Sequence, residues 1–315
     1  MDNIISFIEM KLDQTLMDQA IRRVAAVGLG AMGAPMAARL LKAGWAVRAA
    51  DIDAAARARF AAAGGTACAS AAEAAAQADV LLVMVHTAAQ ADEVLFGAAG
   101  AAPALAPRAV VWLASTVTPA YARELAARLA GHGLSLVDGP VSGGVGKAAD
   151  GTLTVMAGGD AAALDRAGLV MQACAARIYR VGEAGAGSTF KMINQLLTAS
   201  HIALAAEAVA LGARAGIDPA LLVEVIRESA GTSVQFERRA PRMLAGDHTP
   251  HSTVHTFLKD LGIALDAGRS LDFPLPLAAA ANQVFTMAAA LGHGRASDTR
   301  VVSVYESFGA PVQSH

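Results

Sequence analysis

The sequence predicts an α/β protein in which a doubly wound sheet occupies the first half and the second half is entirely helical. From about residue 22 to residue 181, short apolar runs alternate with helix-length patterns, as they do in βαβ units whose strands are buried on both faces. After Gly187 the strand-like runs stop and only helical patterns continue. The boundary between the two halves is predicted between residues 181 and 187.

Runs of valine, leucine and alanine mark the expected strands, and helical spacing of apolar residues fills the intervals between them. We predict parallel strands at residues 24–28, 46–51, 80–85, 110–114, 134–138, 153–157 and 178–181. Helices such as 34–43, 54–63 and 119–131 are expected to connect them. In the second half we expect helices at 188–216, from Pro219 onward, and at 234–244, 253–269, 276–291 and 298–308. Asp218 and Pro219 suit the cap and the first position of the second of these.

Composition narrows the class of protein. The 315 residues are 55% hydrophobic with a formal charge of −2, which suffices for a large core in about two domains. No basic block points to nucleic acid or to an anionic membrane. The longest apolar stretches, such as residues 80–85, fall far short of the ~20 residues of a membrane span. Cys68 and Cys174 form no CxxC pair, so we expect no disulfide framework and no cysteine metal site in a soluble, cytoplasmic protein.

The first 19 residues contain no alanine, although alanine is abundant in the rest of the chain. We interpret residues 1–21 as an N-terminal extension and assign it no function. Residues 22–184 are then predicted to form one domain and residues 185–315 a second, all-helical one.

A glycine motif follows the first predicted strand. The segment Gly28-Leu29-Gly30-Ala31-Met32-Gly33 has the form GxGxxG and lies between a strand and a helix. In a Rossmann-type sheet the first glycine permits the tight turn and the second admits a pyrophosphate to the backbone. The third lets helix and strand pack closely, and the phosphates lie at the helix N-terminus. The motif therefore predicts a dinucleotide site in residues 22–184.

Asp51 ends the second predicted strand, 23 residues beyond Gly28. An acidic residue there suits the hydroxyls of the adenine ribose. Ile52 and Asp53 offer no arginine for a 2′-phosphate, so we predict NAD rather than NADP. The alternative is that Asp51 is an ordinary cap or turn residue. Side chains after the next two strands face the same carboxyl edge of the sheet, where ligands lie; these are His86, Thr87 and Thr116.

Residues 138–148 carry four glycines and follow a strand. Such a loop exposes backbone N–H groups with little steric cover, which suits a carboxylate ligand. A glycine-rich surface turn explains the same composition, and composition alone does not decide between the two.

Lys191 occupies an unusual position for a lysine. If Ser188 caps the helix, Lys191 is the third helical residue and faces the positive end of the helix dipole. That field lowers the pKa of an amine, which favours a general base near neutrality. Asn194 and Gln195 follow at i+3 and i+4 and share its face of the helix. The alternative is a solvated lysine on a surface helix.

Four segments together resemble the β-hydroxyacid dehydrogenases, the family of 3-hydroxyisobutyrate dehydrogenase. They are residues 28–37, 138–144, 185–194 and the pair Lys259-Asp260, in order and at the family's spacing. The resemblance implies that Lys191 is the catalytic lysine and that Ser142, Gly143 and Gly144 hold the substrate carboxylate. It also implies that Asn194 contacts substrate and that Thr116 and Lys259 line the cofactor site. Proton transfer by Lys191 is then worth roughly 10²–10⁴ in rate.

Within this family the sequence resembles the L-threonate dehydrogenase subgroup most, over residues 178–182, 187–189, 195–197, 201–202, 246–252 and 273–277. The subgroup is expected to carry histidine where this chain has Asn194. L-Threonate, oxidised to 2-oxo-tetronate, is thus the first expected substrate, with 3-hydroxyisobutyrate and tartronate semialdehyde as alternatives. A catalytically silent dinucleotide sensor is the alternative of another class. The apolar helices after Gly187 further suggest a homo-oligomer, a dimer or tetramer.

Three histidines form the pattern HxxHxxxH, at His248, His251 and His255. No acid or cysteine accompanies them in a ligand pattern, and hydride transfer needs no metal, so we predict a role in a pocket or an interface rather than a metal site. Three arginines at 238, 239 and 242 suit a cleft or a solvated face equally well. Glu207 is expected to be structural.

Overall fold

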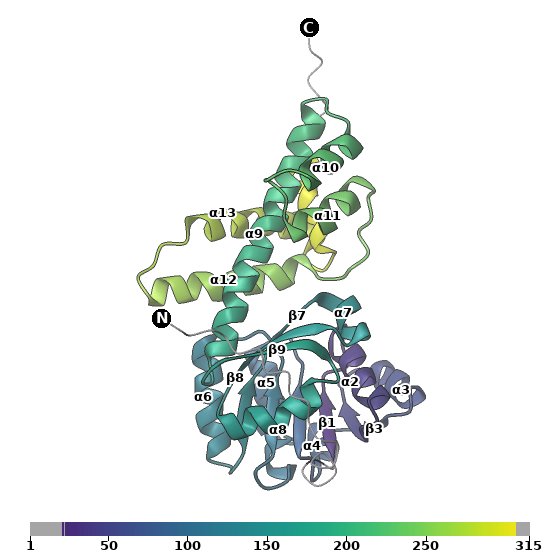
Figure 1. The fold of residues 1–315 in the computed structure, drawn as a ribbon, viewed down its shortest axis with the longest axis vertical. Helices are drawn as coiled ribbons and strands as arrows, with labels where there is room; N and C mark the ends of the chain where they lie inside the picture. Colours follow the sequence, from purple (N-terminus) through teal and green to yellow (C-terminus); the bar gives the residue numbers. More distant parts are fainter. Residues whose placement is uncertain (1–20, 22, 307–315) are drawn as a thin grey trace. The chain divides into compact units, whose positions relative to one another are not determined.

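A computed structural model describes residue 21 and residues 23–306 of the chain (Figure 1). The protein divides into two compact units, with the division between Lys191 and Met192. That division falls inside the long helix α9 (Ala186–Arg214). The predicted N-terminal extension lies, except for its last residue, outside the described residues.

Nine strands of the described residues form one sheet, in the order β3-β2-β1-β4-β5-β6-β8-β7, with β9 also paired to β8. The strands are β1 (Val24–Val27), β2 (Val47–Ala50), β3 (Thr66–Cys68), β4 (Val80–Val83), β5 (Val110–Leu113), β6 (Ser135–Asp138), β7 (Val141–Ser142), β8 (Leu153–Gly158) and β9 (Ala175–Gly182). All pairs from β3 through β6 are parallel. The strand order reverses between β1 and β4, which is the switch point where such sheets bind ligands. The predicted doubly wound sheet is thus confirmed.

The expectation of parallel strands throughout is wrong at one place. Strand β8 runs antiparallel to β6 and β7. Only residues 143–152 connect β7 to β8, and a parallel crossover needs a dozen residues or more. Gly151, in a left-handed conformation at φ +71°, ends the intervening helix and returns the chain. Two short strands, β3 and β7, were not predicted.

Helices cover both faces of the sheet (Figure 1). They are α2 (Gly33–Lys42), α3 (Ala54–Ala62), α4 (Ala71–Ala75), α5 (Ala88–Phe96), α6 (Pro119–Ala130), α7 (Gly144–Asp150) and α8 (Ala161–Met171), with a short 3₁₀ turn, η1 (Ala102–Ala104). Side chains of α2, α3, α7 and α8 enter one core, and those of α4, α5 and α6 enter the other. Neighbouring residues of β1 alternate between these cores, because successive strand side chains point to opposite faces.

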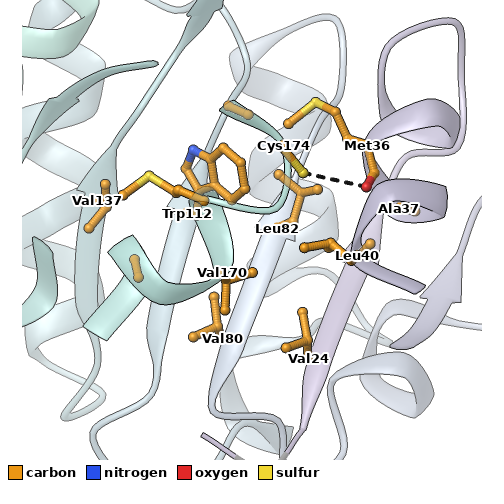
Figure 2. Close-up of a cluster of buried hydrophobic side chains, with 14 of the residues drawn as sticks. Val24, Met36, Ala37, Leu40, Val80, Leu82, Trp112, Val137, Val170 and Cys174 are labelled. Carbon is orange, nitrogen blue, oxygen red and sulfur yellow. Dashed lines mark hydrogen bonds between the residues drawn. The ribbon is translucent and has the colours of Figure 1, made fainter. Parts of the chain in front are cut away.

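Figure 2 shows the first of these cores, where Trp112 of β5 lies among aliphatic side chains from the neighbouring strands. Trp112 is fully buried, and its indole N–H donates to the carbonyl oxygen of Gly139 at 2.8 Å. Cys174 is buried as a free thiol, and its Sγ donates to the carbonyl of Met36 (Figure 2). Burial raises the pKa of this thiol to about 12, so the thiol is protonated and has a structural role.

The helical unit follows the sequence prediction closely. Beyond α9 it contains α10 (Pro219–Arg227), α11 (Val234–Leu244), α12 (Val254–Ser270), α13 (Pro276–Ala288), a π-helical turn η2 (Ala289–His293), a 3₁₀ turn η3 (Asp298–Val302) and α14 (Ser303–Glu306). Asp218 caps α10 as predicted, accepting from the amides of Ala220 and Leu221. The helix predicted to reach residue 291 ends earlier, at Ala288. The last predicted helix extends beyond the described residues.

Apolar side chains from all five long helices form the core of this unit. At its centre the rings of Phe257 and Phe285 lie 5.4 Å apart. Within the described part of the chain, α9 is the one helix that is long and apolar enough by length and composition to cross a membrane. Core helices of soluble proteins meet the same criterion. Ala199, Ile202 and Ala206 of α9 are buried in the core of the helical unit.

Candidate cofactor and substrate site

The three glycines of the GxGxxG turn have different surroundings. Gly28 has φ +94°, and a β-carbon there would lie 2.1 Å from the carbonyl oxygen of Met84. A β-carbon on Gly33 would lie 1.8 Å from the carbonyl oxygen of Gly28. Nothing lies within 4 Å of a β-carbon built on Gly30. The protein's own packing therefore requires Gly28 and Gly33, whereas Gly30 keeps a stretch of backbone accessible, as a close-approaching phosphate needs.

Asp51 lies directly after β2 and hydrogen-bonds to the backbone of the glycine turn. Its Oδ2 accepts from the amide of Leu29 at 2.5 Å, and its Oδ1 accepts from the amide of Asp53 at 2.8 Å. A groove of about 320 Å³ opens beside it. The residues that line this groove are Leu29, Gly30, Ala31, Ala34, Pro35, Asp51, Asp53, Ala56 and Arg59. Gly30 and Asp51 thus line one hollow beside the ends of β1 and β2, the edge at which such sheets bind dinucleotides.

Two arginines near this groove were missed at the sequence level. Arg57 donates to the carbonyl oxygens of Asp51 and Ile52. Arg59 lines the groove, with its guanidinium 3.7 Å from the carboxylate of Asp53. Neither arginine directly follows Asp51 in the sequence. Both lie in α3, which begins at Ala54 and carries them near the groove.

Three further predicted cofactor residues lie just after β4 and β5. Thr87 caps α5 in a reciprocal pair with Gln90, and the exposed His86 precedes it. Thr116 is partly buried. Between these two strand ends, the fully buried Ser115 accepts from the amide of Val85 at 2.8 Å. That bond holds the two strand ends in register.

The start of α9 differs from the sequence prediction. The helix begins at Ala186, so Ser188 is not its cap and Lys191 is its sixth residue rather than its third. The N-terminal cap of α9 comes instead from a strand that is distant in the sequence. Asp138, at the end of β6, accepts from the amides of Gly185 and Ser188 at 3.0 and 2.8 Å and from the Ser188 hydroxyl at 2.6 Å. Because the dipole field falls off within the first turn, it does not account for the position of Lys191.

Asp138 is fully buried. Burial raises the pKa of its carboxyl above the usual range, while the hydrogen bonds from Ser188 and Gly185 and the charge of Arg123 act in the opposite direction. Gly187 allows α9 to approach this strand closely, since a β-carbon there would lie 2.2 Å from the carbonyl oxygen of Asp138 and 2.4 Å from that of Met156.

Lys191 is buried, with 8% of its surface exposed. Its Nζ donates to the carbonyl oxygen of Val141 at 2.8 Å. Val141 precedes Ser142, so the amine lies beside the predicted carboxylate loop. Gly143 and Gly144 of that loop have φ values of +144° and +77°, conformations that favour glycine. The first unit therefore brings Lys191 together with Ser142, Gly143 and Gly144, and the alternative of a solvated surface lysine is wrong.

In the helical unit, a series of hydrogen bonds and one ion pair links Asn194 to Lys259. The amide of Asn194 donates to Gln195 Oε1 at 3.0 Å, and Gln195 Nε2 donates to Asp260 Oδ2 at 2.5 Å. Lys259 Nζ lies 2.8 Å from Asp260 Oδ1. Asp260 is 2% exposed, so a buried carboxylate fixes both Gln195 and Lys259.

Four other residues of the helical unit that the sequence singled out make internal contacts. Arg239 pairs with the fully buried Asp298 at 2.9 Å, and Arg242 pairs with Asp247. His248 shares a hydrogen bond with Thr299, and burial together with the charge of Arg300 lowers its pKa. Tyr305 donates to Glu207. Among the described residues, no three histidine, cysteine or acidic side chains are grouped to hold a metal ion. A larger hollow of about 600 Å³ lies between the end of α12 and the start of α13 and contains no predicted site residue.

Comparison with known proteins identifies both units. Residues 23–182 match the family model of the NAD binding domain of 6-phosphogluconate dehydrogenase. Residues 185–305 match that of the NAD-binding domain of NADP-dependent 3-hydroxyisobutyrate dehydrogenase. The chain is 49% identical to an L-threonate dehydrogenase of Cupriavidus necator over 92% of this chain and 98% of that protein. It is 44% identical to an L-threonate dehydrogenase of Escherichia coli over 91% of this chain and 96% of that one.

A solved structure gives the same result. The crystal structure of a 3-hydroxyisobutyrate dehydrogenase from Salmonella typhimurium superposes with a TM-score of 0.84 at 44% identity, covering 90% of this chain and 99% of that one. The family models cover both units, and the relatives are aligned over almost their full length. The chain therefore belongs to the β-hydroxyacid dehydrogenase family and is an NAD(P)-binding oxidoreductase that acts on CH–OH groups.

Proposed function

We propose that this protein oxidises L-threonate, or a closely related four-carbon sugar acid, to the 2-oxo acid with NAD as the cofactor. The observation that carries the proposal is the Lys191 amine held 2.8 Å from the Val141 carbonyl, next to the Ser142–Gly144 loop. A proton acceptor and a carboxylate-binding loop then lie side by side, as oxidation of a hydroxy acid requires. The relatives named L-threonate dehydrogenase support the choice of acid.

Each residue has a role in this proposal. Ser142 and the backbone N–H groups of Gly143 and Gly144 hold the substrate carboxylate. Neutral Lys191 takes the proton from the substrate hydroxyl in oxidation and returns it in reduction. Asn194 contacts the substrate. When bound, the nicotinamide supplies the hydride acceptor.

The two parts of the chain have distinct tasks in the proposal. Residues 22–184 bind the dinucleotide through Gly28–Gly33, Asp51, His86, Thr87 and Thr116. Residues 185–315 supply Lys191, Asn194 and Lys259 and the contacts between subunits. The free, buried cysteines are consistent with a reducing, cytoplasmic environment.

A screen of C3–C6 hydroxy acids with NAD and NADP, followed by absorbance of the reduced nicotinamide, tests the function. We expect the highest kcat/KM for L-threonate. Asn194 differs from the histidine expected in that subgroup, so 3-hydroxyisobutyrate and the reverse reaction on tartronate semialdehyde are the alternatives to include. Tight binding of NADH without turnover of any acid would instead indicate a dinucleotide sensor.

The preference for NAD is a separate prediction. The Asp51 carboxylate faces the groove, and its charge repels a 2′-phosphate. We expect kcat/KM with NAD to exceed that with NADP by about tenfold or more, a difference of ~1.4 kcal/mol. Asp51→Asn keeps an acceptor for the amide of Leu29 but removes the charge. It is therefore expected to lower the ratio of kcat/KM with NAD to kcat/KM with NADP. The nearby Arg59 attracts the 2′-phosphate of NADP, and Arg59→Ala is therefore expected to raise the ratio of kcat/KM with NAD to that with NADP. A wild-type preference for NADP contradicts the assignment.

We also propose a homo-oligomer. Leu197, Leu204 and Leu211 recur every seven residues along α9 and are 50%, 61% and 69% exposed in the single chain, a stripe typical of a helix that packs on a partner. Light scattering is expected to give a multiple of the 31.9 kDa chain mass. The double variant Leu204→Glu, Leu211→Glu is expected to lower that mass, and Leu271→Glu, equally exposed outside α9, is the control. A monomeric wild-type protein contradicts the proposal.

A further inference from the structure

The segment from Asp138 to Val141 holds α9 at two points. At its first residue, the Asp138 carboxylate accepts three hydrogen bonds from Gly185 and Ser188, at the start of the helix. At its last residue, the carbonyl oxygen of Val141 accepts from Lys191 Nζ. The two attachment points on the helix are only three residues apart, from Ser188 to Lys191.

This segment is itself rigidly fixed. Asp138 pairs with β8 at Gly158, and Val141 pairs with Val155 of the same strand. Between them, the Gly139 carbonyl accepts from the indole of the fully buried Trp112. A side chain at Gly139 would come within 2.7 Å of that indole nitrogen. The strand end, the turn and the carboxylate loop thus form one support that cannot move without disturbing the core.

We infer that Asp138 is a positioning residue for the reaction: its carboxylate fixes the first turn of α9 so that the Lys191 amine lies beside Ser142–Gly144. The inference rests on the proposed role of Lys191. Asp138 touches neither substrate nor cofactor in this assignment and acts only through Lys191. A displacement of about 1 Å at a reacting group lowers rates up to ~100-fold, so the anchor matters for turnover beyond its contribution to folding.

The geometry of the three bonds predicts which substitution preserves the anchor. In Asp138→Asn, the amide oxygen can replace Oδ2 and accept from both backbone N–H groups. The –NH₂ group can replace Oδ1 and donate to the Ser188 hydroxyl, which also accepts hydrogen bonds. Asp138→Ala removes all three bonds. Ser188→Ala removes only the bond to the hydroxyl.

A matched control exists in the same unit. Asp160 caps α8 by accepting from the amide of Ala163 at 2.8 Å, and this bond involves no predicted site residue. Asp160→Ala therefore removes a helix cap and lowers the melting temperature without affecting Lys191. The full-length enzyme and the preferred hydroxy acid are used for every variant.

We expect Asp138→Ala to lower kcat about 10- to 100-fold, with the KM for NAD within about twofold of wild type. The acid limb of its kcat–pH profile, which reports the base, is expected to move, whereas that of Asp160→Ala is not. Asp138→Asn is expected to retain kcat within about threefold. If Asp138→Ala does not fold, Ser188→Ala carries the test, with an expected loss in kcat of about threefold or more.

Two results overturn the inference. One is Asp138→Ala, or Ser188→Ala in its place, with the kcat and pH profile of the Asp160→Ala control. The other is Asp138→Asn as impaired as Asp138→Ala, which would show that the charge rather than the geometry matters. Lys191→Ala separates this inference from the proposed function. If Lys191→Ala stays active, the general-base role itself is wrong; if it is inactive while Asp138→Ala behaves as the control, only the positioning role is wrong.

Discussion

Replacing Lys191 by alanine is expected to lower kcat for hydroxy acid oxidation by about 10²–10⁴-fold, the usual contribution of a positioned proton acceptor. The Kd for NADH is expected to stay within about threefold of wild type, because the groove beside Gly30 and Asp51 does not include Lys191. Single-turnover measurements with saturating NAD, together with NADH titration by fluorescence, measure the two quantities separately.

Two further variants control this experiment. Lys42→Ala removes an exposed lysine near the end of α2 and is expected to leave kcat unchanged. Lys191→Arg places a group that is positively charged at all working pH values, so it cannot accept a proton and is expected to be as inactive as Lys191→Ala. Substantial activity in Lys191→Arg would indicate that charge, rather than proton transfer, is the contribution of Lys191.

Much of the sheet was predictable because its strands are buried on both faces and read as continuous apolar runs. The ends of β1, β2 and β5 were placed within one or two residues of their observed positions. The direction of β8 was not predictable from such runs, since apolar content carries no sign of orientation. It followed from the short connection between β7 and β8, and β7 itself is only two residues long.

The start of α9 shows a second limit. Sequence signals for helix caps are local and compare residues three or four apart. The acceptor that caps α9 is Asp138, which precedes Ser188 by 50 residues. Ser188 was therefore correctly placed at the helix start but given the wrong role. In the same way, Arg59 lines the groove beside Gly30 and Asp51 because it lies in α3, and no single-sequence pattern pairs it with Asp53.

The glycine turn provides the second large expected effect, because its glycines should fail in different ways. Gly33→Ala places a β-carbon 1.8 Å from the carbonyl oxygen of Gly28. Forced overpacking of this kind costs about 1–3 kcal/mol or more, so the melting temperature is expected to fall. Gly30→Ala meets nothing within 4 Å and is expected to leave the melting temperature unchanged within about 2 °C.

Although Gly30→Ala is expected to leave the melting temperature unchanged, it is expected to weaken cofactor binding. The new β-carbon occupies space that a pyrophosphate needs in order to reach the backbone, so the Kd for NADH is expected to rise about tenfold or more. Gly168→Ala, at a helical glycine of α8 with equally open space around its β-carbon, is the control. Its melting temperature should not fall, because alanine is favoured over glycine inside a helix, and its Kd for NADH should not change. A stable Gly30→Ala protein that binds NADH as tightly as wild type would show that the phosphates do not approach this turn. The role of the motif would then be confined to the packing that Gly28 and Gly33 already explain.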